Sequence, residues 1–587
     1  MRPQWRISAF ARMSPRGWVR IHRGWVGLVV LLLPFEMFTP WIDTAWFRIT
    51  NWEIAFYGLL IFTLGRVWMD RSFRLRSLWW RDCALRVTWA ALVAWLGWAA
   101  VAAGWAPFHS WAAWKFAVRW ILAAAFVPIV VGTVRTIRDL RYVCHALLLG
   151  AGISAVLGIL EWFQWSPVTA VLAMFKAAPT HVGGFLRISA TFPYATIAAM
   201  FFEAVLPVGL VLWATANSWQ LRILYALGCS TLALAVVSTQ TRTGVVTLWL
   251  VLAALTVWGW RDSHLRSLRR PAGWMIVLIL LGVGMLTVAQ RAHIRWFTVD
   301  DSEWYGAVYT VPGVIRGRTG DVVTVRIRVR NTGRMEWRPE AAHPVVLGMR
   351  WLTANGQAQI GAGHLEFELP HAVPPGGSVE LQVPVRMEWP PGEYRIVWGM
   401  LQRNILWFRS RNVPEAISRV IVRPGRAPST LPAQIGIHPL PSGRTAPEPV
   451  LRRITLWRTA VRMLETSPWL GVGPDNFRRM YGRYLGFQSW DQRIHANNTF
   501  LEILADIGVP GFLAWLVFVV CITGIGVRVA LRAPAAMTRQ WAAGTLAGWC
   551  AFLIHGILDY FLAFHATLLL WMLLAGFILV LHLNIRR

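Results

Sequence analysis

Apolar runs alternate with short polar segments along most of the chain. Each run is close to the roughly 20 residues that an α-helix needs to cross the hydrocarbon core of a bilayer. The runs lie at about 24–41, 54–70, 86–104, 113–133, 142–163, 194–214, 222–240, 244–260, 273–290, 511–531, 540–558 and 561–582. The pattern predicts a membrane all-α protein with about twelve transmembrane helices, nine in residues 1–290 and three in residues 511–587.

A different pattern fills residues 303–424 and predicts strands. From Asp321 to Arg330 apolar and polar side chains alternate, as they do in a strand with one buried face, and the turn residues Asn331 to Gly333 follow. Further strand signals lie between Pro and Gly turns, at 344–352, 378–386, 393–402 and 417–423. Short strands at regular spacing predict a β-sandwich, and the pattern of turns and tryptophans resembles immunoglobulin-like domains. Residues 425–448, rich in Pro, Gly and Ser, predict a linker.

Residues 449–510 carry the polar segment nearest to the tenth predicted span. Their first part has apolar positions at helical spacing with arginines between them, which predicts an interfacial amphipathic helix. Further on, Thr499 and Glu502 have the spacing of a capping box, and Gly508 with Pro510 supplies a stop signal. We therefore expect a short capped helix here. It places the polar side chains of His495, Asn497 and Asn498 one short helix away from the membrane.

Charge sets the expected orientation. The chain is 56% hydrophobic with a net charge of +30, a balance that could suggest nucleic acid. However, the cations are mostly arginines in alternate short loops, with 25 Lys and Arg on one side of the predicted spans and 5 on the other. This is the positive-inside pattern, so we expect an inner-membrane protein with both termini cytoplasmic and residues 291–510 outside. Nucleic-acid binding is not expected.

Four motifs indicate which family of membrane proteins the chain resembles. In chain order they are Arg187-Ile-Ser-Ala-Thr-Phe-Pro-Tyr before the sixth span, Thr241-Arg242-Thr243-Gly244 between spans seven and eight, Gly471-Val-Gly473 in the large loop, and the stretch from His495 to Gly508-x-x-Gly511. Together, and in register with twelve spans and a large loop before span ten, they resemble the O-antigen ligase and O-antigen polymerase family. The resemblance covers most of the chain except the β insert.

The resemblance implies a glycosyltransferase of polysaccharide biosynthesis in the cell envelope. Its donor would be a glycan on undecaprenyl diphosphate, its acceptor a hydroxyl group on a glycan, lipid or protein, and its reaction would need neither metal nor cofactor. Guanidinium groups suit phosphate oxygens and stabilise a departing diphosphate. We therefore assign Arg187 and Arg242 to diphosphate binding. The alternative for both is an interfacial arginine that extends toward water.

The residues expected to act on the acceptor hydroxyl depart from the spacing that the family shows. The family places a histidine directly before its asparagine, eleven residues ahead of the first glycine, and that position holds Asn497 here. Either His495, two positions upstream, activates or orients the acceptor hydroxyl, or this chain works without that histidine. We assign His495, Asn497 and Asn498 as catalytic candidates. The alternatives are a loop histidine bonded to backbone and, for Asn498, a helix cap.

Other residues are supporting candidates. Gly471 and Gly473 would shape the mouth of the site, and Arg119 and Asp559 lie near the outer ends of spans four and eleven. Glu161, Glu203 and His555 are more simply explained as packing residues.

Several classes remain open or are disfavoured. Ligase, polymerase and protein O-oligosaccharyltransferase share these motifs, and a transporter of a small anion is the alternative from another class. A transporter would need polar groups near the midplane of the membrane, whereas these motifs lie at span ends. The five cysteines show no disulfide or zinc spacing, and no nucleotide-binding loop is present.

Overall fold

A computed structural model describes most of the chain. The described residues are 15–44, 48–69, 82–176, 180–182, 185–290, 301–341, 344–356, 359–403, 406–411, 413–425, 437–438, 453–486 and 490–585. The predicted linker at 425–448 lies almost wholly outside them.

Within these ranges, nine helical stretches are long and apolar enough to cross a membrane. They are α4 (Cys83–Gly104), α5 and α6 (Ser110–Ala124 and Phe126–Thr133), α7 (Ile137–Glu161), α9 (Ala195–Ala214), α10 (Trp219–Ser238), α11 (Arg242–Arg261), α12 (Arg266–Gln290), α16 (Thr499–Arg532) and α18 (His565–Ile585). The chain is therefore a multi-pass membrane protein.

The other three predicted spans are also helical, as α1 (Pro15–Leu32), α2 (Asn51–Met69) and α17 (Ala536–His555), but they are not among the nine. The total of twelve stays a prediction. Helix α1 ends well before residue 41, the predicted end of its apolar run. Pro34 disfavours helical geometry in the residue before it. In the segment that follows, the Asn51 side chain donates to the carbonyl of Phe35 and accepts from the amide of Met37, both at 2.8 Å.

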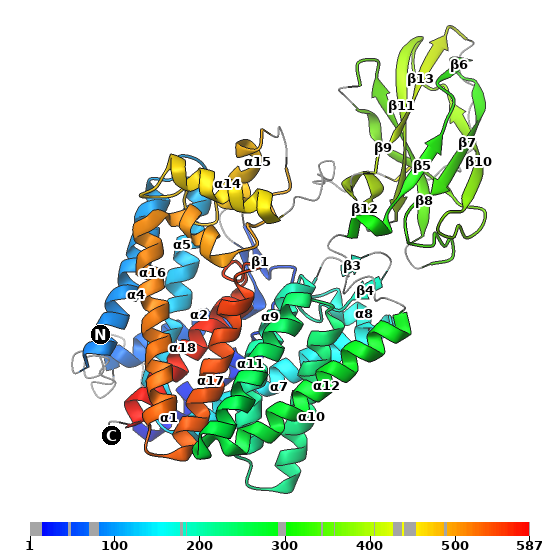
Figure 1. Ribbon diagram of the computed structural model, residues 1–587. Coiled ribbons are helices and arrows are strands. Elements are labelled where there is room, and N and C mark those ends of the chain that lie inside the picture. The colour runs from blue at the N-terminus through cyan, green and yellow to red at the C-terminus, as the bar shows by residue number, and fades with distance from the viewer. Residues whose placement is uncertain are drawn as a thin grey trace, which may run out of the picture.

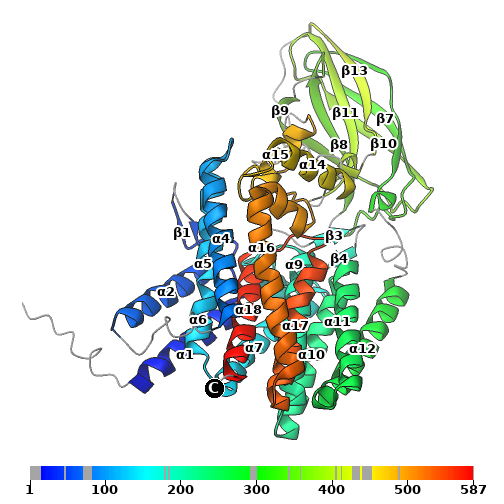
Figure 2. The same cartoon turned by 60° about the vertical axis from the view of Figure 1, so that its left-hand side comes forward.

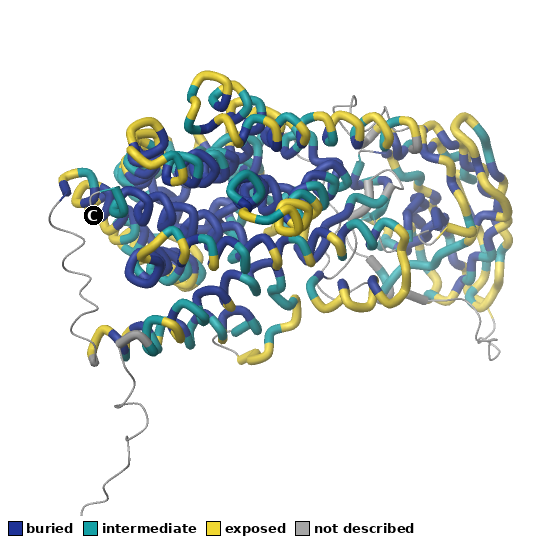
Figure 3. Tube along the Cα trace, turned by 90° about the horizontal axis from the view of Figure 1, so that it is seen from below, coloured by how far each residue is buried: buried dark blue, intermediate teal, exposed yellow. Residues whose placement is uncertain are grey.

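The helices form one bundle around a buried centre (Figure 1). The windows of α9 and α18 that could span a membrane are each 94% buried, whereas those of α10, α11 and α12 are 39%, 39% and 22% buried. Figure 3 shows this contrast as a dark centre surrounded by exposed turns. Helix α17 packs against both α9 and α16, and α16 packs along α4. Residues from both ends of the sequence therefore build one core.

Two sheets make up the β region, which stands beyond one end of the bundle (Figures 1 and 2). The smaller sheet has the order β10 (Ser378–Arg386), β7 (Val322–Asn331), β5 (Ala307–Thr310). The larger sheet has the order β14 (Ile437–His438), β9 (Gln359–Glu368), β8 (Val345–Thr353), β11 (Gly392–Gln402), β13 (Ala416–Arg423), β6 (Val314–Arg318), with β12 (Leu406–Trp407) paired to β11. Strands β13 and β6 run parallel, and every other pair is antiparallel.

Side chains of both sheets fill a single core. Val329 and Val383 contribute from the smaller sheet, and Trp398 and Val420 from the larger one, all fully buried. The strands predicted at 344–352, 378–386, 393–402 and 417–423 are present as β8, β10, β11 and β13. Strand β9 was not predicted because two glycines interrupt its alternation. The immunoglobulin-like and sandwich classification stays a prediction.

Short elements cap the bundle at the end nearest the β region, which we call the α14 end. They include α14 (Arg453–Thr466) and α15 (Phe477–Tyr484), with α8 (Ser166–Leu172) and the pairs β1 (Ile42–Asp43) with β2 (Arg48–Ile49) and β3 (Thr180–Val182) with β4 (Phe185–Arg187). The helix predicted from the apolar spacing after residue 453 is confirmed as α14.

Candidate functional site

Helix α16 is broken close to its start. Gly508 has φ 67° and ψ −177°, outside helical geometry, and Pro510 has no N–H. The carbonyl of Asp506, four residues before the proline, therefore has no helical donor. The predicted stop at Gly508 and Pro510 is present as this break, but the chain re-enters a helix at once instead of passing through a loop.

The Gly-x-Gly turn fills the break. The amides of Val472 and Gly473 donate to the carbonyls of Ala505 and Asp506 at 2.9 and 2.8 Å. Gly471 has φ 65°, and a Cβ on it would lie 2.4 Å from the oxygen of Ala505. Only glycine combines this backbone conformation with so close an approach. The structure thus brings the predicted Gly471 and Gly473 onto the predicted helix break.

We expect Gly471→Ala to destabilise the protein strongly. A side chain in the left-handed region costs roughly 1–2 kcal/mol, and here the clash with α16 is added to that cost. Gly486 is the matched control, because it has φ 79° and open space around its Cβ position. Thermal unfolding of the detergent-solubilised protein should show a clearly larger loss for Gly471→Ala than for Gly486→Ala. Equal losses would contradict the docking of the turn on the break.

The side chain of Asp506 organises the segment after the turn. It is fully buried, and its two oxygens accept the backbone amides of Asp475 and Phe477 at 2.8 and 2.9 Å. Asp475 in turn binds the guanidinium of Arg478 with two hydrogen bonds of 2.6 and 2.5 Å. Arg478 also donates to the carbonyl of Gln492 at 2.7 Å. This chain of contacts connects the helix break to the loop that carries His495.

His495 forms a pair with Glu502. Its Nδ1 lies 2.5 Å from Oε1 of Glu502, and the amide of Ala496 donates to Oε2 at 2.8 Å. The Glu502 side chain is fully buried and the His495 side chain is 12% exposed. In the tautomer whose Nδ1–H donates to the carboxylate, Nε2 carries the lone pair. The pair therefore orients the imidazole and leaves one nitrogen able to accept a proton.

The pKa of His495 is raised above its ordinary value. Burial alone would lower this pKa, but the charge of Glu502 and its hydrogen bond to the imidazole outweigh burial. The charge of Asp475 acts in the same direction. A histidine with a raised pKa is a stronger base than a free imidazole.

The asparagines have different local roles. Asn498 is the N-cap of α16, where its side chain accepts from the amide of Leu501 at 3.0 Å, so the capping alternative for Asn498 is confirmed. The predicted capping box is wrong, because Glu502 binds His495 instead of closing the helix end. Asn497 has φ 51°, a left-handed conformation that asparagine tolerates well.

The segment between α17 and α18 contacts His495. The ring of Tyr560 lies 4.9 Å from the imidazole, and Thr499 donates through its hydroxyl to the carbonyl of Asp559 at 2.9 Å. Burial raises the pKa of Asp559, while the amide of Tyr560 and the charges of Arg453, His495 and Arg187 oppose the rise. The electrostatic neighbourhood of Asp559 therefore contains two of the predicted site residues.

Arg187 and Arg242 come together at the start of α11. Arg187 donates through Nε to the carbonyl of Thr239 at 2.9 Å and through Nη2 to the hydroxyl of Thr241 at 3.0 Å. Arg242 follows Thr241 directly as the first residue of α11. The two predicted arginines thus belong to adjoining backbone segments at one end of the bundle, and the plane of the Arg187 guanidinium is fixed.

A buried ion pair fixes the loop after Arg187. Lys176 and Glu161 are paired with side chains 5% and 3% exposed, and Lys176 also donates to the hydroxyl of Ser189 at 2.8 Å. The second oxygen of Glu161 accepts the amides of Ser189 and Ala190 at 3.2 and 3.1 Å. Glu161 is therefore a structural residue, as expected, and it holds the chain two residues beyond Arg187.

We expect Lys176→Met to destabilise the protein by about 3–5 kcal/mol, because it leaves the Glu161 carboxylate buried without its partner. The double variant Lys176→Met with Glu161→Gln removes both charges and should recover part of the loss. Thermal unfolding in detergent measures both. A single variant as stable as the wild type would show that the ion pair does not hold this loop.

A second buried pair lies among the spans. His555 Nδ1 is 2.8 Å from Glu203 Oε1, and both side chains are fully buried. A Cβ on Gly244 would lie 3.3 Å from the other oxygen of Glu203, so α11 packs closely against this pair. Both residues therefore have the packing partners that were expected.

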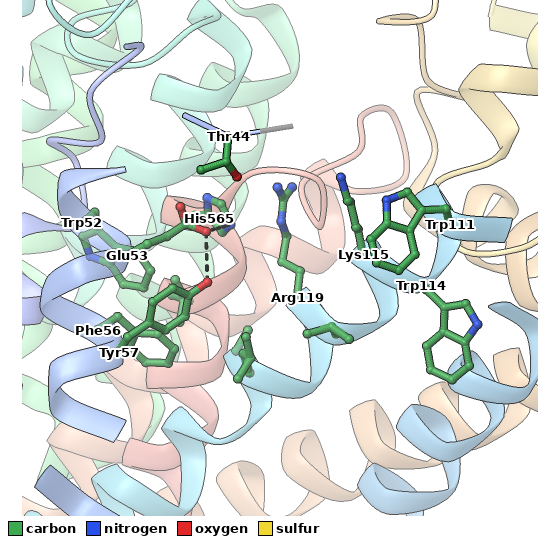
Figure 4. A pocket seen from close by; sticks show the side chains of 14 residues that line it. Thr44, Trp52, Glu53, Phe56, Tyr57, Trp111, Trp114, Lys115, Arg119 and His565 are labelled. Atoms are coloured by element: carbon green, nitrogen blue, oxygen red, sulfur yellow. Dashed lines mark hydrogen bonds and ion pairs between the residues drawn. The ribbon is translucent and has the colours of Figure 1, made fainter. Parts of the chain in front are cut away.

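Arg119 is not brought into this cluster. It lines a cavity between α2, α5 and α18 and donates to the carbonyl of Ala563 at 3.1 Å (Figure 4). The segment that contains Ala563 also contains Asp559, so the cavity and the site share one connecting segment.

Several residues of the site were not singled out from the sequence. Glu502 was interpreted as a cap, and Asp506 and Tyr560 had no assigned role. The signal for Glu502 and Asp506 was their position. Burying two carboxylates at i and i+4 at the start of a span costs free energy unless each has a partner. Their partners lie in distant turns and could not be identified from spacing.

One family model, described as O-antigen ligase, matches residues 440–516. The matched segment contains α14, the Gly-x-Gly turn, the His495–Glu502 pair and the break in α16, whereas Arg187, Arg242 and Asp559 lie outside it. No curated protein matches the chain. The match falls on the segment that builds most of the site, and it supports placing the chain in the O-antigen ligase and O-antigen polymerase family.

Proposed function

We propose that the protein transfers an oligosaccharide or polysaccharide from undecaprenyl diphosphate to an acceptor hydroxyl group at the outer face of the cytoplasmic membrane. The family match supports glycan transfer of the O-antigen ligase type in general. The observation that carries the specific proposal is the gathering of a histidine base and two arginines at the α14 end of the bundle.

Arg187 and Arg242 bind the diphosphate in this proposal. Attack by the acceptor oxygen on the anomeric carbon breaks the bond from that carbon to the phosphate oxygen, and negative charge develops on the diphosphate. A guanidinium held in a fixed plane stabilises that charge without reorganisation. The hydrogen bonds from Arg187 to Thr239 and Thr241 provide such a fixed plane.

His495 takes the proton of the acceptor hydroxyl through Nε2, and Glu502 stabilises the imidazolium that forms. The new bond joins the acceptor oxygen to the anomeric carbon from the face opposite the leaving group, so the configuration inverts. Asn497 and Asn498 hold the backbone on which His495 is carried, and Asn498 does so as the helix cap. In this chain His495 thus performs the role that the family pattern gives to the histidine beside the asparagine.

The proposal is tested with purified protein, a lipid-linked oligosaccharide and a panel of acceptors: a glycan, a glycolipid and a hydroxyl-bearing peptide. We expect transfer to one acceptor class in the presence of a metal chelator and without nucleotide. The acceptor that is used separates ligase, polymerase and protein glycosylation. Failure with every acceptor, or a strict need for metal, would contradict the proposal.

A further inference from the structure

The cavity between α2, α5 and α18 has no part in the reaction proposed above. Its volume is about 840 Å³, within the range of pockets that bind small molecules. Arg119, a supporting candidate from its place in the sequence, lines this cavity, whereas the residues assigned to diphosphate binding and to proton transfer do not. In Figure 4 its labelled side chains come from α2, α5 and α18, with Thr44 from the segment before α2.

The charged side chains of the cavity and its histidine come from all three helices. Glu53 is the third residue of α2, His565 is the first residue of α18, and Lys115 and Arg119 lie one helical turn apart on α5. In Figure 4 the charged ends of Lys115 and Arg119 point to the same side of the cavity as His565.

The apolar lining lies deeper along the same helices. Phe56, Leu122 and Leu569 line the cavity about one turn or more beyond the polar residues of their own helices. On the flank of α5, Trp111 and Val118 are 59% and 44% exposed. The cavity therefore has both charged and apolar side chains in its lining.

The charges are unevenly balanced. His565 is 2.6 Å from Glu36 and 3.7 Å from Glu53, so Glu53, which lines the cavity, shares the histidine with Glu36, which lies beside it. Within the part of the chain that the structure describes, neither Lys115 nor Arg119 forms a direct ion pair with a carboxylate. Lys115 contacts the ring of Trp111 instead, at 5.3 Å. Two cations are thus placed at the polar end for an anion.

We propose that this cavity binds a lipid whose anionic head group carries a phosphate. The phosphate lies against Lys115 and Arg119, and the chain of the lipid follows Phe56, Leu122 and Leu569 into the bundle. An amphiphile fits because the cavity offers cations together with apolar side chains, whereas a free anion would leave the apolar lining without a partner. The binding does not depend on the transfer reaction, so it can be tested without any glycan substrate.

Native mass spectrometry of the full-length protein in a neutral detergent tests this binding. The probes are phosphatidylglycerol, phosphatidylcholine with the same chains, and inorganic phosphate. We expect phosphatidylglycerol to be retained at least tenfold more strongly than phosphatidylcholine, and phosphate alone to be retained weakly. Lys115→Gln and Arg119→Gln should each weaken retention roughly tenfold, since each removes a hydrogen bond from a cation to the phosphate.

Two further variants separate this site from general attraction to the basic surface. Arg269→Gln removes a cation on α12 that lies over the ring of Trp260 on α11, outside the cavity lining, and should leave retention unchanged. Leu122→Trp fills the apolar part without altering any charge and should reduce retention. Equal binding of the two lipids, or equal effects of Arg269→Gln and Lys115→Gln, would overturn the lipid site. Strong binding of phosphate alone would assign the cavity to a soluble anion and likewise overturn it.

Discussion

Arg187→Ala should lower the rate of glycan transfer by roughly 10²–10³-fold, the effect of removing one preorganised donor from a developing negative charge. The loss should appear mainly in kcat, because the charge on the diphosphate grows as the bond to the sugar breaks. Arg187→Lys keeps a positive charge but lacks the planar fork with which the guanidinium donates to Thr239 and Thr241, and we expect it to recover only part of the rate. The measurement is the initial rate of transfer at saturating lipid-linked donor.

Arg222→Ala is the matched control for this prediction. Arg222 also donates from Nε to a backbone carbonyl, that of Ala216. It lies at the start of α10, whereas Thr239, which accepts from Arg187, follows the other end of that helix. Its loss should leave the rate within about twofold of the wild type. If both alanine variants keep the full rate, Arg187 does not bind the leaving group.

His495→Ala should lower the transfer rate by roughly 10²–10⁴-fold, the range for loss of a general base. Glu502→Gln should lower it less and should also change its dependence on pH. The base must be neutral to accept a proton, so the rate rises with pH through the pKa of His495. Glu502 raises that pKa, and its removal lets burial lower it. The rising limb should therefore move to lower pH in Glu502→Gln.

If the His495–Glu502 pair had a purely structural role, Glu502→Gln would not shift the rising limb of the pH–rate profile. His364→Ala is the matched control, because His364 pairs with Glu366 at 2.9 Å in the β region and has no part in the reaction. It should leave both the rate and the pH profile unchanged. An unshifted limb in Glu502→Gln, or a fully active His495→Ala, would remove His495 from the role of base. Asn497→His could then show whether the family position restores activity.

Membrane helices and strands were largely predictable because their patterns are local. A run of about 20 apolar residues or an alternating strand needs no knowledge of distant partners. The break at Gly508 was also predictable, because glycine and proline act on their own backbone. The end of helix α1 was misplaced because the local effect of Pro34 was not used, and the contacts of Asn51 with the segment that follows Pro34 are non-local.

The candidate site was predictable only in part. The arginines stood out because they lie at span ends where the charge pattern does not require them, and the structure brings Arg187 beside Thr241 and Arg242. Glu502 was misinterpreted because the carboxylate that could cap the helix at Thr499 pairs instead with His495, seven residues upstream. The role of Asp506 depends on a turn about thirty residues earlier, which no local pattern records.

The most direct measurement counts both products of a single reaction. Purified protein is mixed with lipid-linked oligosaccharide and its acceptor, without nucleotide, and the released undecaprenyl diphosphate and the transferred glycan are quantified together. We expect one diphosphate released for each glycan transferred, no release without acceptor, and neither product from Arg187→Ala with His495→Ala. Release of diphosphate without transfer, or transfer that continues in the double variant, would contradict glycan transfer at this site.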